Sequence, residues 1–273
     1  MPNDAANFTK NYYNIRIKMM YNKKTRGYEI MEGMETLKQW VNESDNIVFF
    51  GGAGVSTESG IPDFRSVDGL YHQKYDYPPE TILSHTFFMR KTPEFYKFYA
   101  DKMLVEGAKP NAAHLKLAEW EKQGKLKAVI TQNIDGLHQM AGSQEVLELH
   151  GSVQRNYCMK CHEFFDFASI KERMNEAEDL VPKCPKCGGT IKPDVVLYEE
   201  GLDNDVMMNA IYYISHADVL IIGGTSLVVY PAAGLIDYYR GNKLVLVNLS
   251  STSRDSRADL VIHGKIGEVF SQL

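Results

Sequence analysis

A glycine-rich run is the first segment of the sequence whose residue types could do chemistry. Gly52 and Gly54 follow the apolar run at residues 47–50, which predicts a buried strand that ends in a sharp turn. Without side chains at these glycines, the backbone could approach a pyrophosphate closely. We expect a helix to follow, with its first N–H groups facing the anion and with caps supplied by Ser56, Thr57 and Ser59. The run predicts a dinucleotide site, but Gly-x-Gly also occurs in plain strand-to-helix turns, and Thr57 stands where the usual fingerprint has a third glycine.

Amide and carboxylate side chains follow a second predicted strand. Gln132, Asn133 and Asp135 come directly after the apolar run at residues 126–130. In an open parallel sheet, ligands bind outside the carboxyl ends of the strands. These side chains could therefore bind ribose hydroxyls and a carboxamide at the edge where the glycine-rich turn lies.

A histidine ends a third predicted strand. His150 follows the predicted strand at residues 146–149 and precedes Gly151. An imidazole with a pKa near 6.5 is suited to general-base work at neutral pH. The sequence positions of other histidines indicate surface or packing roles: His72, His85, His114, His162, His216 and His263.

The cysteines form two Cys-x-x-Cys pairs, Cys158 with Cys161 and Cys184 with Cys187. Two such pairs are typical of a zinc ribbon, in which four thiolates bind one tetrahedral Zn²⁺. A closed shell of four thiolates leaves no open position on the metal, so the zinc is expected to be structural. The alternative is a redox Cys-x-x-Cys, which seldom occurs as two linked pairs.

A second turn of small residues, Gly224, Thr225 and Ser226, follows the predicted strand at residues 219–222. Backbone and hydroxyl groups there could meet the adenosine phosphate and ribose, and Asn248 ends the next predicted strand as a ribose partner would. An ordinary strand-to-helix turn is the alternative for both positions.

Three of these motifs resemble those of the sirtuins, the NAD-dependent protein deacylases of the silent-information-regulator type. Residues 52–65 match the Gly-Ala-Gly-x-Ser-x-x-Ser-Gly-Ile-Pro-Asp-Phe-Arg signature, residues 132–135 match Gln-Asn-x-Asp, and residues 149–151 match Leu-His-Gly. The resemblance covers roughly residues 33–273. It implies that NAD⁺ contacts Gly52, Ala53, Gly54, Ser56, Ser59, Ile61, Pro62, Asp63, Phe64, Arg65, Tyr71, Gln132, Asn133, Ile134, Asp135, His150, Gly224, Thr225, Ser226, Asn248, Leu249 and Ile266.

The resemblance also implies an activity. NAD⁺ is cleaved as the acyl oxygen of an acyl-lysine attacks the ribose carbon, and the products are lysine, nicotinamide and O-acyl-ADP-ribose. His150 is implied as the base that takes a proton from a ribose hydroxyl, while Asn133 and Gln132 orient ribose and water. The acyl-lysine segment of a protein substrate is implied to add as an extended strand, contacting Val195, Leu197 and Tyr198.

Two positions bear on the substrate. The family usually has glycine where Glu199 stands, so contacts beyond Tyr198 are not implied. The Tyr-x-x-Arg pair of family members that prefer acidic acyl chains is absent. Three places after Tyr96 stands Tyr99, and three places after Tyr71 stands Lys74, so neither pair contains an arginine. Acetyl, or a longer neutral acyl chain, is the expected substrate group.

Two other classes of function are open. A protein ADP-ribosyltransferase on the same fold would not need the base, and the intact Leu149-His150-Gly151 speaks against it. A non-catalytic NAD-binding module would release no nicotinamide.

The elements that must position these residues alternate between strand and helix, which predicts an α/β fold with a Rossmann-like, doubly wound parallel sheet, a small zinc-ribbon domain and a helical lobe. Amphipathic helices are expected over residues 34–41, 111–123, 203–215, 231–240 and 265–273, a helix-like insert over 164–181, and further strands over 192–201, 244–248 and 258–262. The predicted domains are an N-terminal extension (1–32) and a catalytic domain (33–273) made of a core (33–69, 110–150, 192–273), a helical lobe (70–109) and a zinc-ribbon module (151–191).

Composition limits the partners. A chain of 273 residues with a formal net charge of −5 has no basic surplus for phosphate backbones, so we expect no nucleic-acid partner. No apolar run is long enough to span a bilayer, and no secretory signal precedes the cysteines, so a reducing, cytoplasmic location is expected. Residues 10–28 carry basic side chains and no acid, which fits either an unstructured extension or a targeting or binding tail. The sequence does not indicate an oligomeric state.

Overall fold

The computed structural model of the chain describes residues 32–64 and 76–273. Two of the residues implied to contact NAD⁺, Arg65 and Tyr71, lie outside the described residues, as does the extension at residues 1–31.

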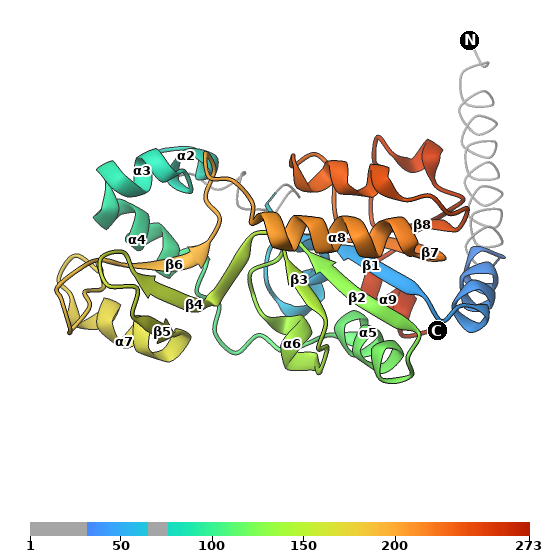
Figure 1. The fold of residues 1–273 in the computed structure, drawn as a ribbon, viewed down its shortest axis with the longest axis horizontal. Helices are drawn as coiled ribbons and strands as arrows, with labels where there is room; N and C mark the ends of the chain where they lie inside the picture. Colours follow the sequence, from blue (N-terminus) through green and yellow to red (C-terminus); the bar gives the residue numbers. More distant parts are fainter. Residues whose placement is uncertain (1–31, 65–75) are drawn as a thin grey trace, which may run out of the picture.

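The main sheet has six parallel strands in the order β3-β2-β1-β7-β8-β9 (Figure 1). The chain starts in the middle at β1, runs outward to β3, then crosses to β7 and runs outward the other way. This is the strand order of a Rossmann fold, with its switch point between β1 and β7. The predicted doubly wound parallel sheet is confirmed. Its strands are β1 (Ile47–Gly51), β2 (Leu126–Thr131), β3 (Val146–Glu148), β7 (Val219–Gly223), β8 (Leu244–Asn248) and β9 (Leu260–His263).

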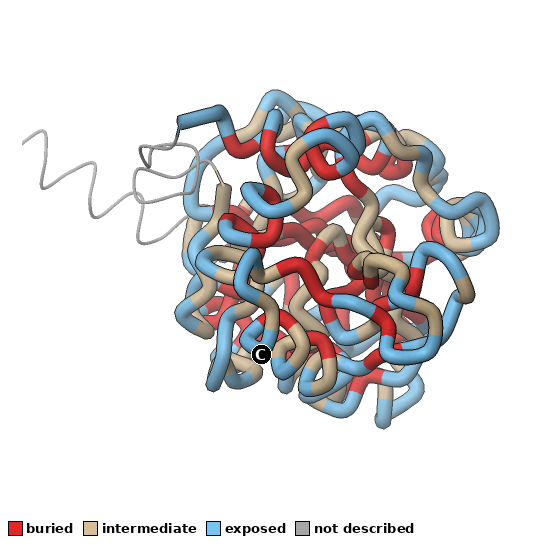
Figure 2. The backbone as a smooth tube through the Cα atoms, turned by 90° about the vertical axis from the view of Figure 1, so that its left-hand side faces the viewer, coloured by how far each residue is buried: buried red, intermediate tan, exposed pale blue. Residues whose placement is uncertain are grey.

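Helices cover both faces of this sheet. Ile47 and Phe49 of β1 point to one face, where residues 32–43 are helical and α5 (Ala112–Lys122) and α9 (Ile266–Phe270) pack. Val48 and Phe50 point to the other face, under α8 (Asn204–His216) and the 3₁₀ helix η4 (Ala232–Tyr238). Figure 2 shows the buried backbone running through the centre of the molecule with exposed segments around it. Burial on both faces explains why the strands read as continuous apolar runs.

The predicted α-helix after the glycines is wrong. Residues 53–59 form two 3₁₀ helices of three residues each, η1 (Ala53–Val55) and η2 (Thr57–Ser59), and Ser56 makes no side-chain cap. Gly60 follows in the left-handed region at φ 85°, and Pro62 then excludes a continuing helix. The helix predicted over residues 231–240 is likewise a 3₁₀ helix, η4, and not an α-helix. Gly234 inside η4 weakens a regular α-helix.

A smaller unit stands beside the carboxyl ends of the main sheet (Figure 1). Its antiparallel sheet has the order β5-β4-β6 and carries the helix α7. The predicted helix-like insert is confirmed in α7 but begins with the strand β5, and the predicted strand at 192–201 ends at Val195. The elements are β4 (Gly151–Cys158), β5 (Phe164–Asp166), α7 (Phe167–Glu176) and β6 (Ile191–Val195).

Short helices form a lobe against this unit: α2 (Pro79–Ile82), α3 (His85–Arg90) and α4 (Thr92–Lys102). Their aromatic side chains pack with the apolar side chains of β5, α7 and β6 in one cluster, which includes Phe88, Phe95, Tyr96, Tyr99, Phe165, Ile170 and Ile191. These aromatic side chains therefore serve as core packing between the lobe and the smaller unit. The remaining short elements are α6 (Leu137–Ala141) and η5 (Asp255–Arg257). Within residues 32–64 and 76–273, no helix has the length and apolarity that crossing a bilayer requires.

Candidate active site

Three strands deliver the candidate residues to one edge of the sheet. Gly51 at the end of β1 lies opposite Thr131 of β2 on one side and Gly223 of β7 on the other. The backbone N–H of Gln132 donates to the Gly51 carbonyl (3.0 Å), and that of Gly52 donates to the Gly223 carbonyl (3.3 Å). The two small-residue turns and the Gln-Asn pair, which are far apart in the sequence, are thus neighbours at the switch point.

The two glycine turns interlock. The Gly54 N–H donates to the Gly224 carbonyl over 2.8 Å. A Cβ at Gly54 would lie 2.8 Å from Gly224 Cα, and one at Gly224, where φ is +60°, would lie 2.3 Å from the Val55 nitrogen. Such close backbone approach excludes side chains at both positions. The two turns are therefore packed against each other at the switch point, where a dinucleotide pyrophosphate binds in this type of sheet.

A buried hydroxyl joins the glycine turn to the second strand. The Asn133 amide Nδ2 donates to Ser56 Oγ (3.0 Å), and Ser56 Oγ donates to Asp135 Oδ2 (2.6 Å). Asn133 and Ser56 are both buried. The predicted role of Ser56 as a helix cap is therefore wrong. Ser56 orients the Asn133 amide and the Asp135 carboxylate instead.

His150 is held in one tautomer beside the Gln-Asn pair. Its Nδ1 lies 3.0 Å from the Gln132 carbonyl oxygen, which can only accept, so Nδ1 carries the proton and Nε2 keeps its lone pair. Burial lowers the pKa of His150 below its usual 6.5, and the hydrogen bond to the Gln132 carbonyl raises it by less. The imidazole is neutral at pH 7, as a general base must be.

The backbone around His150 is fixed by a close strand contact and by an arginine. Gly151 has φ +74°, and a Cβ there would lie 1.9 Å from the Asp194 carbonyl oxygen. Arg155 of β4 bonds Glu148 at the end of β3 (2.6 Å) and Asp194 of β6 (2.8 Å). Sequence reasoning missed Arg155, because an arginine in a strand carries no signal of the two carboxylates that it joins.

The second turn is tied to the first by side chains. Asn248 Oδ1 accepts from the Thr225 N–H (3.0 Å), and Asn248 Nδ2 donates to the Thr225 carbonyl (3.1 Å). Gln132 Nε2 donates to Thr225 Oγ1 over 3.1 Å. Among the other residues implied on this side, Ser226 and Leu249 are exposed, while Ile266 is buried with its Cδ1 against Gly223.

The residues implied to contact the substrate lie next to His150 and Gly151. Val195 pairs with Gly151, and the Val196 N–H donates to the His150 carbonyl over 3.0 Å. Val195 is partly buried against the lobe cluster, as are Phe64 and Ile134. Leu197 is buried, and Tyr198 is 39% exposed. This segment therefore connects His150 to the lobe.

Glu199, which stands where the family usually has glycine, keeps the backbone shape of a glycine. Its φ is +77°, in the left-handed region that a side chain disfavours. Its carboxylate accepts from the Thr86 N–H (2.8 Å) at the start of α3. This contact ties the segment after Tyr198 to the lobe.

The four cysteine sulfurs converge. All four lie within 4.8 Å of one another, with 3.4 Å between Cys158 and Cys187 and 3.7 Å between Cys161 and Cys184. Tetrahedral Zn²⁺ with bonds of about 2.3 Å requires sulfur–sulfur distances of about 3.8 Å. All four cysteines are free thiols, and the donor set fits one zinc ion. The cluster lies at the far end of β4 from His150, which agrees with a structural role.

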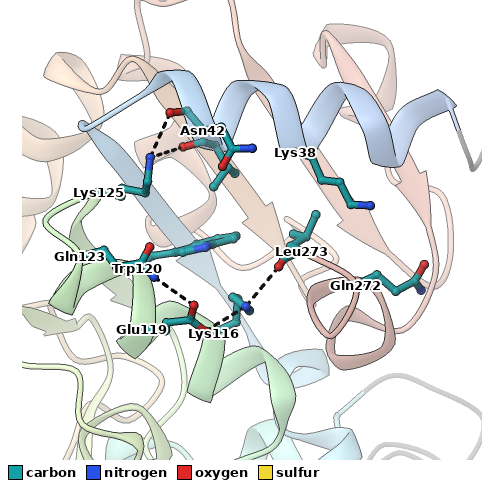
Figure 3. A pocket seen from close by; sticks show the side chains of 10 residues that line it. Lys38, Asn42, Lys116, Glu119, Trp120, Gln123, Lys125, Gln272 and Leu273 are labelled. Carbon is teal, nitrogen blue, oxygen red and sulfur yellow. Dashed lines mark hydrogen bonds and ion pairs between the residues drawn. The ribbon is translucent and has the colours of Figure 1, made fainter.

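A cavity of about 350 Å³ lies away from this site, near the amino ends of the strands (Figure 3). Lys125 donates from one side of it to the carbonyls of Val41 and Asn42, and Lys116 donates to the Leu273 carbonyl. The residues that line it include none of the predicted site residues, so the cavity is not part of the candidate active site.

Comparisons with known proteins agree with these features. A model of the Sir2 family matches residues 52–231, which include the first glycine turn, the Gln-Asn pair, His150 and all four cysteines. Two relatives named NAD-dependent protein deacetylase, from Clostridium acetobutylicum and Clostridium tetani, are each 60% identical over 88% of this chain and over 98% and 96% of their own lengths.

Solved structures of Sir2 enzymes have the same fold. One that addresses the mechanism and regulation of Sir2 enzymes is 43% identical with a TM-score of 0.80, and one with a p53 peptide and NAD⁺ is 40% identical with a TM-score of 0.79. Each covers 88% of this chain and 96% of the solved chain. From its glycine turns, its His150 site and these relatives, we conclude that the chain belongs to the Sir2 family.

Proposed function

We propose that Gln132, Asn133 and His150 form the catalytic centre of this enzyme. The protein is an NAD-dependent protein-lysine deacetylase, which converts acyl-lysine and NAD⁺ to lysine, nicotinamide and O-acyl-ADP-ribose. The observation that supports the catalytic centre best is the hydrogen bond from His150 Nδ1 to the Gln132 carbonyl. It holds a neutral base next to Asn133 at the switch point of the sheet.

The residues at the switch point fit NAD⁺. Gly52, Gly54 and Gly224 let the two turns pack together at the switch point, where a pyrophosphate can lie against them, and the oriented amides of Gln132 and Asn133 can bind ribose hydroxyls. When bound, NAD⁺ supplies a glycosidic bond to nicotinamide whose cleavage drives the transfer of the acyl group. The other contacts stay predictions: Ala53, Ser56, Ser59, Ile61, Pro62, Asp63, Phe64, Ile134, Asp135, Thr225, Ser226, Asn248, Leu249 and Ile266, with Arg65 and Tyr71 outside the described residues.

His150 works through its second nitrogen. Because Nδ1 is committed to the Gln132 carbonyl, only Nε2 can accept a proton, and we assign to it the proton of a ribose hydroxyl. Asn133 is fixed by Ser56, so its amide can hold the ribose and a water in place while the proton moves. The buried hydrogen bonds need no rearrangement during this transfer.

The pH profile tests this base. Because the pKa of His150 is lowered, the base form persists below pH 6.5, and kcat/KM for an acetyl-lysine peptide should stay level from pH 8 down past 6.5. Below the lowered pKa it should fall about tenfold per pH unit. Circular dichroism at each pH checks that the protein remains folded. A profile that is already half-maximal at or above pH 6.5, in folded protein, would contradict the assignment.

The glycine turn can be tested by one methyl group. In Gly54→Ala the new Cβ would meet the Gly224 backbone at 2.8 Å, so the two turns must move apart. We expect the Kd for NAD⁺, measured by calorimetry, to rise at least about tenfold, because overpacking of this kind costs about 1–3 kcal/mol. Gly201→Ala is the matched control, since a Cβ there meets nothing within 4 Å. Equal affinities in the two variants would rule out the turn as the pyrophosphate site.

Acyl-lysine proteins are the substrates of this enzyme, and we propose that their acylated segment lies along Val195, Leu197 and Tyr198. The pairing of Val195 with Gly151 and the bond from the Val196 N–H to the His150 carbonyl support this position of the segment. Solved Sir2 structures hold an acetylated and a propionylated peptide, which fits the expected preference for acetyl or a longer neutral acyl chain.

One assay tests the activity and the acyl preference together. The protein is incubated with NAD⁺ and a set of acyl-lysine peptides, and peptide mass and nicotinamide are measured in the same samples. We expect loss of the acyl group with one nicotinamide released per peptide. A peptide that gains ADP-ribose and keeps its acyl group would indicate a transferase, and no nicotinamide release would indicate a binding module.

We further propose the domain division predicted above, with the core at 33–69, 110–150 and 192–273, the lobe at 70–109 and the zinc-ribbon module at 151–191 around one structural Zn²⁺. The separate sheet β5-β4-β6 and the convergent cysteines support the module. A cytoplasmic location stays a prediction, which fits four thiols kept free to bind metal.

A further inference from the structure

The first glycine turn is held in place by neighbouring elements. We call residues 52–60 the cofactor turn. It contains two three-residue 3₁₀ helices and no regular helix, and only Val55 of η1 and η2 is buried. Its internal hydrogen bonds close single 3₁₀ turns and do not tie the segment to the rest of the fold, so its position depends on what neighbouring elements supply. Contacts to Gly224 and Asp135 come from within the candidate site.

Asn111 supplies a support from outside the site. It is the N-cap of α5, and its Oδ1 accepts from the Ala113 N–H over 2.9 Å. Its Nδ2 donates to the Val55 carbonyl (2.8 Å) and to Ser59 Oγ (3.0 Å). The oxygen of this amide thus caps the start of α5, and its nitrogen holds the cofactor turn at two points.

His114 holds the backbone of Asn111 in place. His114 is fully buried, and its Nδ1 accepts from the Asn111 N–H over 3.3 Å, which completes the capping box. Its ring packs 4.7 Å from the ring of His138, which is also buried. Burial lowers the pKa of His114 to about 4, against a smaller opposite effect of Asp135, so Nδ1 stays an acceptor at neutral pH. The Asn111 backbone is therefore held at the start of α5, and the bond from the Ala113 N–H orients its side-chain amide before any ligand binds.

We propose that Asn111 is a positioning residue for the NAD⁺ pyrophosphate, acting through the cofactor turn. The inference rests on the proposed function, in that the turn is taken as the pyrophosphate site. Asn111 touches neither the reacting bond nor His150. Its loss should weaken NAD⁺ binding in the ground state and the transition state alike, which raises KM and leaves kcat unchanged.

Asn111→Asp separates this role from the helix cap. Aspartate caps a helix as well as asparagine does, so the bond to Ala113 is kept. The new oxygen cannot donate to the Val55 carbonyl and instead repels it. We expect the KM and the Kd for NAD⁺ to rise about tenfold, with kcat within about threefold and with KM for the acetyl-lysine peptide unchanged. The melting temperature should fall as well, because the Val55 carbonyl loses its donor. Asn111→Ser, which also keeps a cap but is too short to reach the turn, should behave alike.

Asp166→Ala is the matched control for stability. Asp166 is the N-cap of α7 in the zinc-ribbon module, where it accepts from the Ser169 N–H (2.8 Å) and does not contact the cofactor turn. It should lower the melting temperature and leave the affinity for NAD⁺ unchanged. Asn111 variants that bind NAD⁺ as tightly as the wild type would overturn the inference, whatever their stability.

The Kd keeps the two proposals apart. If the wild type binds NAD⁺ but turns over no acyl-lysine, the proposed function fails. A tenfold higher Kd for NAD⁺ in Asn111→Asp still supports the inference in that case. If the wild type is active and the variant has the same Kd and KM, the inference fails and the proposed function stands.

Discussion

Replacing His150 with alanine is expected to lower kcat for an acetyl-lysine peptide about a thousandfold, which lies within the range that a general base contributes. The reason is the fixed tautomer, in which Nε2 is the available acceptor for the ribose proton. Binding should persist, because the glycine turns and the Asn133 amide are held by bonds that do not involve the imidazole. We expect the Kd for NAD⁺, measured by calorimetry, to change less than about threefold.

This variant also separates the classes of function. A deacetylase loses acyl-lysine turnover, a transferase would still label protein with ADP-ribose, and a binding module would release no nicotinamide in either form. His216→Ala is the control, because His216 is an exposed residue at the end of α8 and should leave the rate unchanged. Near-normal turnover in His150→Ala would remove His150 from the mechanism.

Replacing Cys184 with serine is expected to remove the zinc and to unfold the module that it holds. Cys158 and Cys184 are buried, and the three-stranded sheet has no core separate from the cluster that it shares with the lobe. Structural zinc contributes about 10–16 kcal/mol of folding free energy in small zinc-binding units. Because Gly151 and Val195 of that sheet border His150, activity should be lost together with the metal.

Metal content and thermal unfolding measure this effect directly. The wild type should contain one zinc per chain by mass spectrometry of the metal, while Cys184→Ser should contain less than about a tenth of that and lose a cooperative part of its melting transition. Lys186→Ala is the neighbouring control, since Lys186 makes an exposed ion pair with Glu163 and should leave the zinc in place. A Cys184→Ser protein with a full zinc content and an unchanged melt would show that the four thiols do not form the site.

The sheet could be predicted from the sequence because burial on both faces leaves a local record. Residues 219–222 and 244–247 are continuous apolar runs, and each forms a strand at the predicted place. The helix caps Asn111 and Asp203 mark their helix starts in the same local way. The candidate site could be predicted because glycines, amides and a histidine directly follow such strands.

The part that could not be predicted depends on contacts distant in sequence. Ser56 reads as a helix cap from its neighbours, but its hydroxyl bonds Asp135, which is 79 residues away. The sequence predicts Asn111 only as the first residue of a helix, although its Nδ2 reaches Val55 and Ser59. Arg155 gives no signal of its two carboxylate partners. In each case one residue type serves a local and a tertiary role, and only the fold decides between them.

The central claim is that His150, Gln132 and Asn133 meet the ribose of NAD⁺ at the switch point of the sheet. A crystal structure of the wild type with NAD⁺ and an unmodified lysine peptide, which cannot turn over, tests it most directly. We predict the pyrophosphate against Gly54 and Gly224, and His150 Nε2 within about 3.2 Å of a ribose hydroxyl. NAD⁺ bound at another place, or a ribose whose hydroxyls lie beyond reach of His150, would contradict the account.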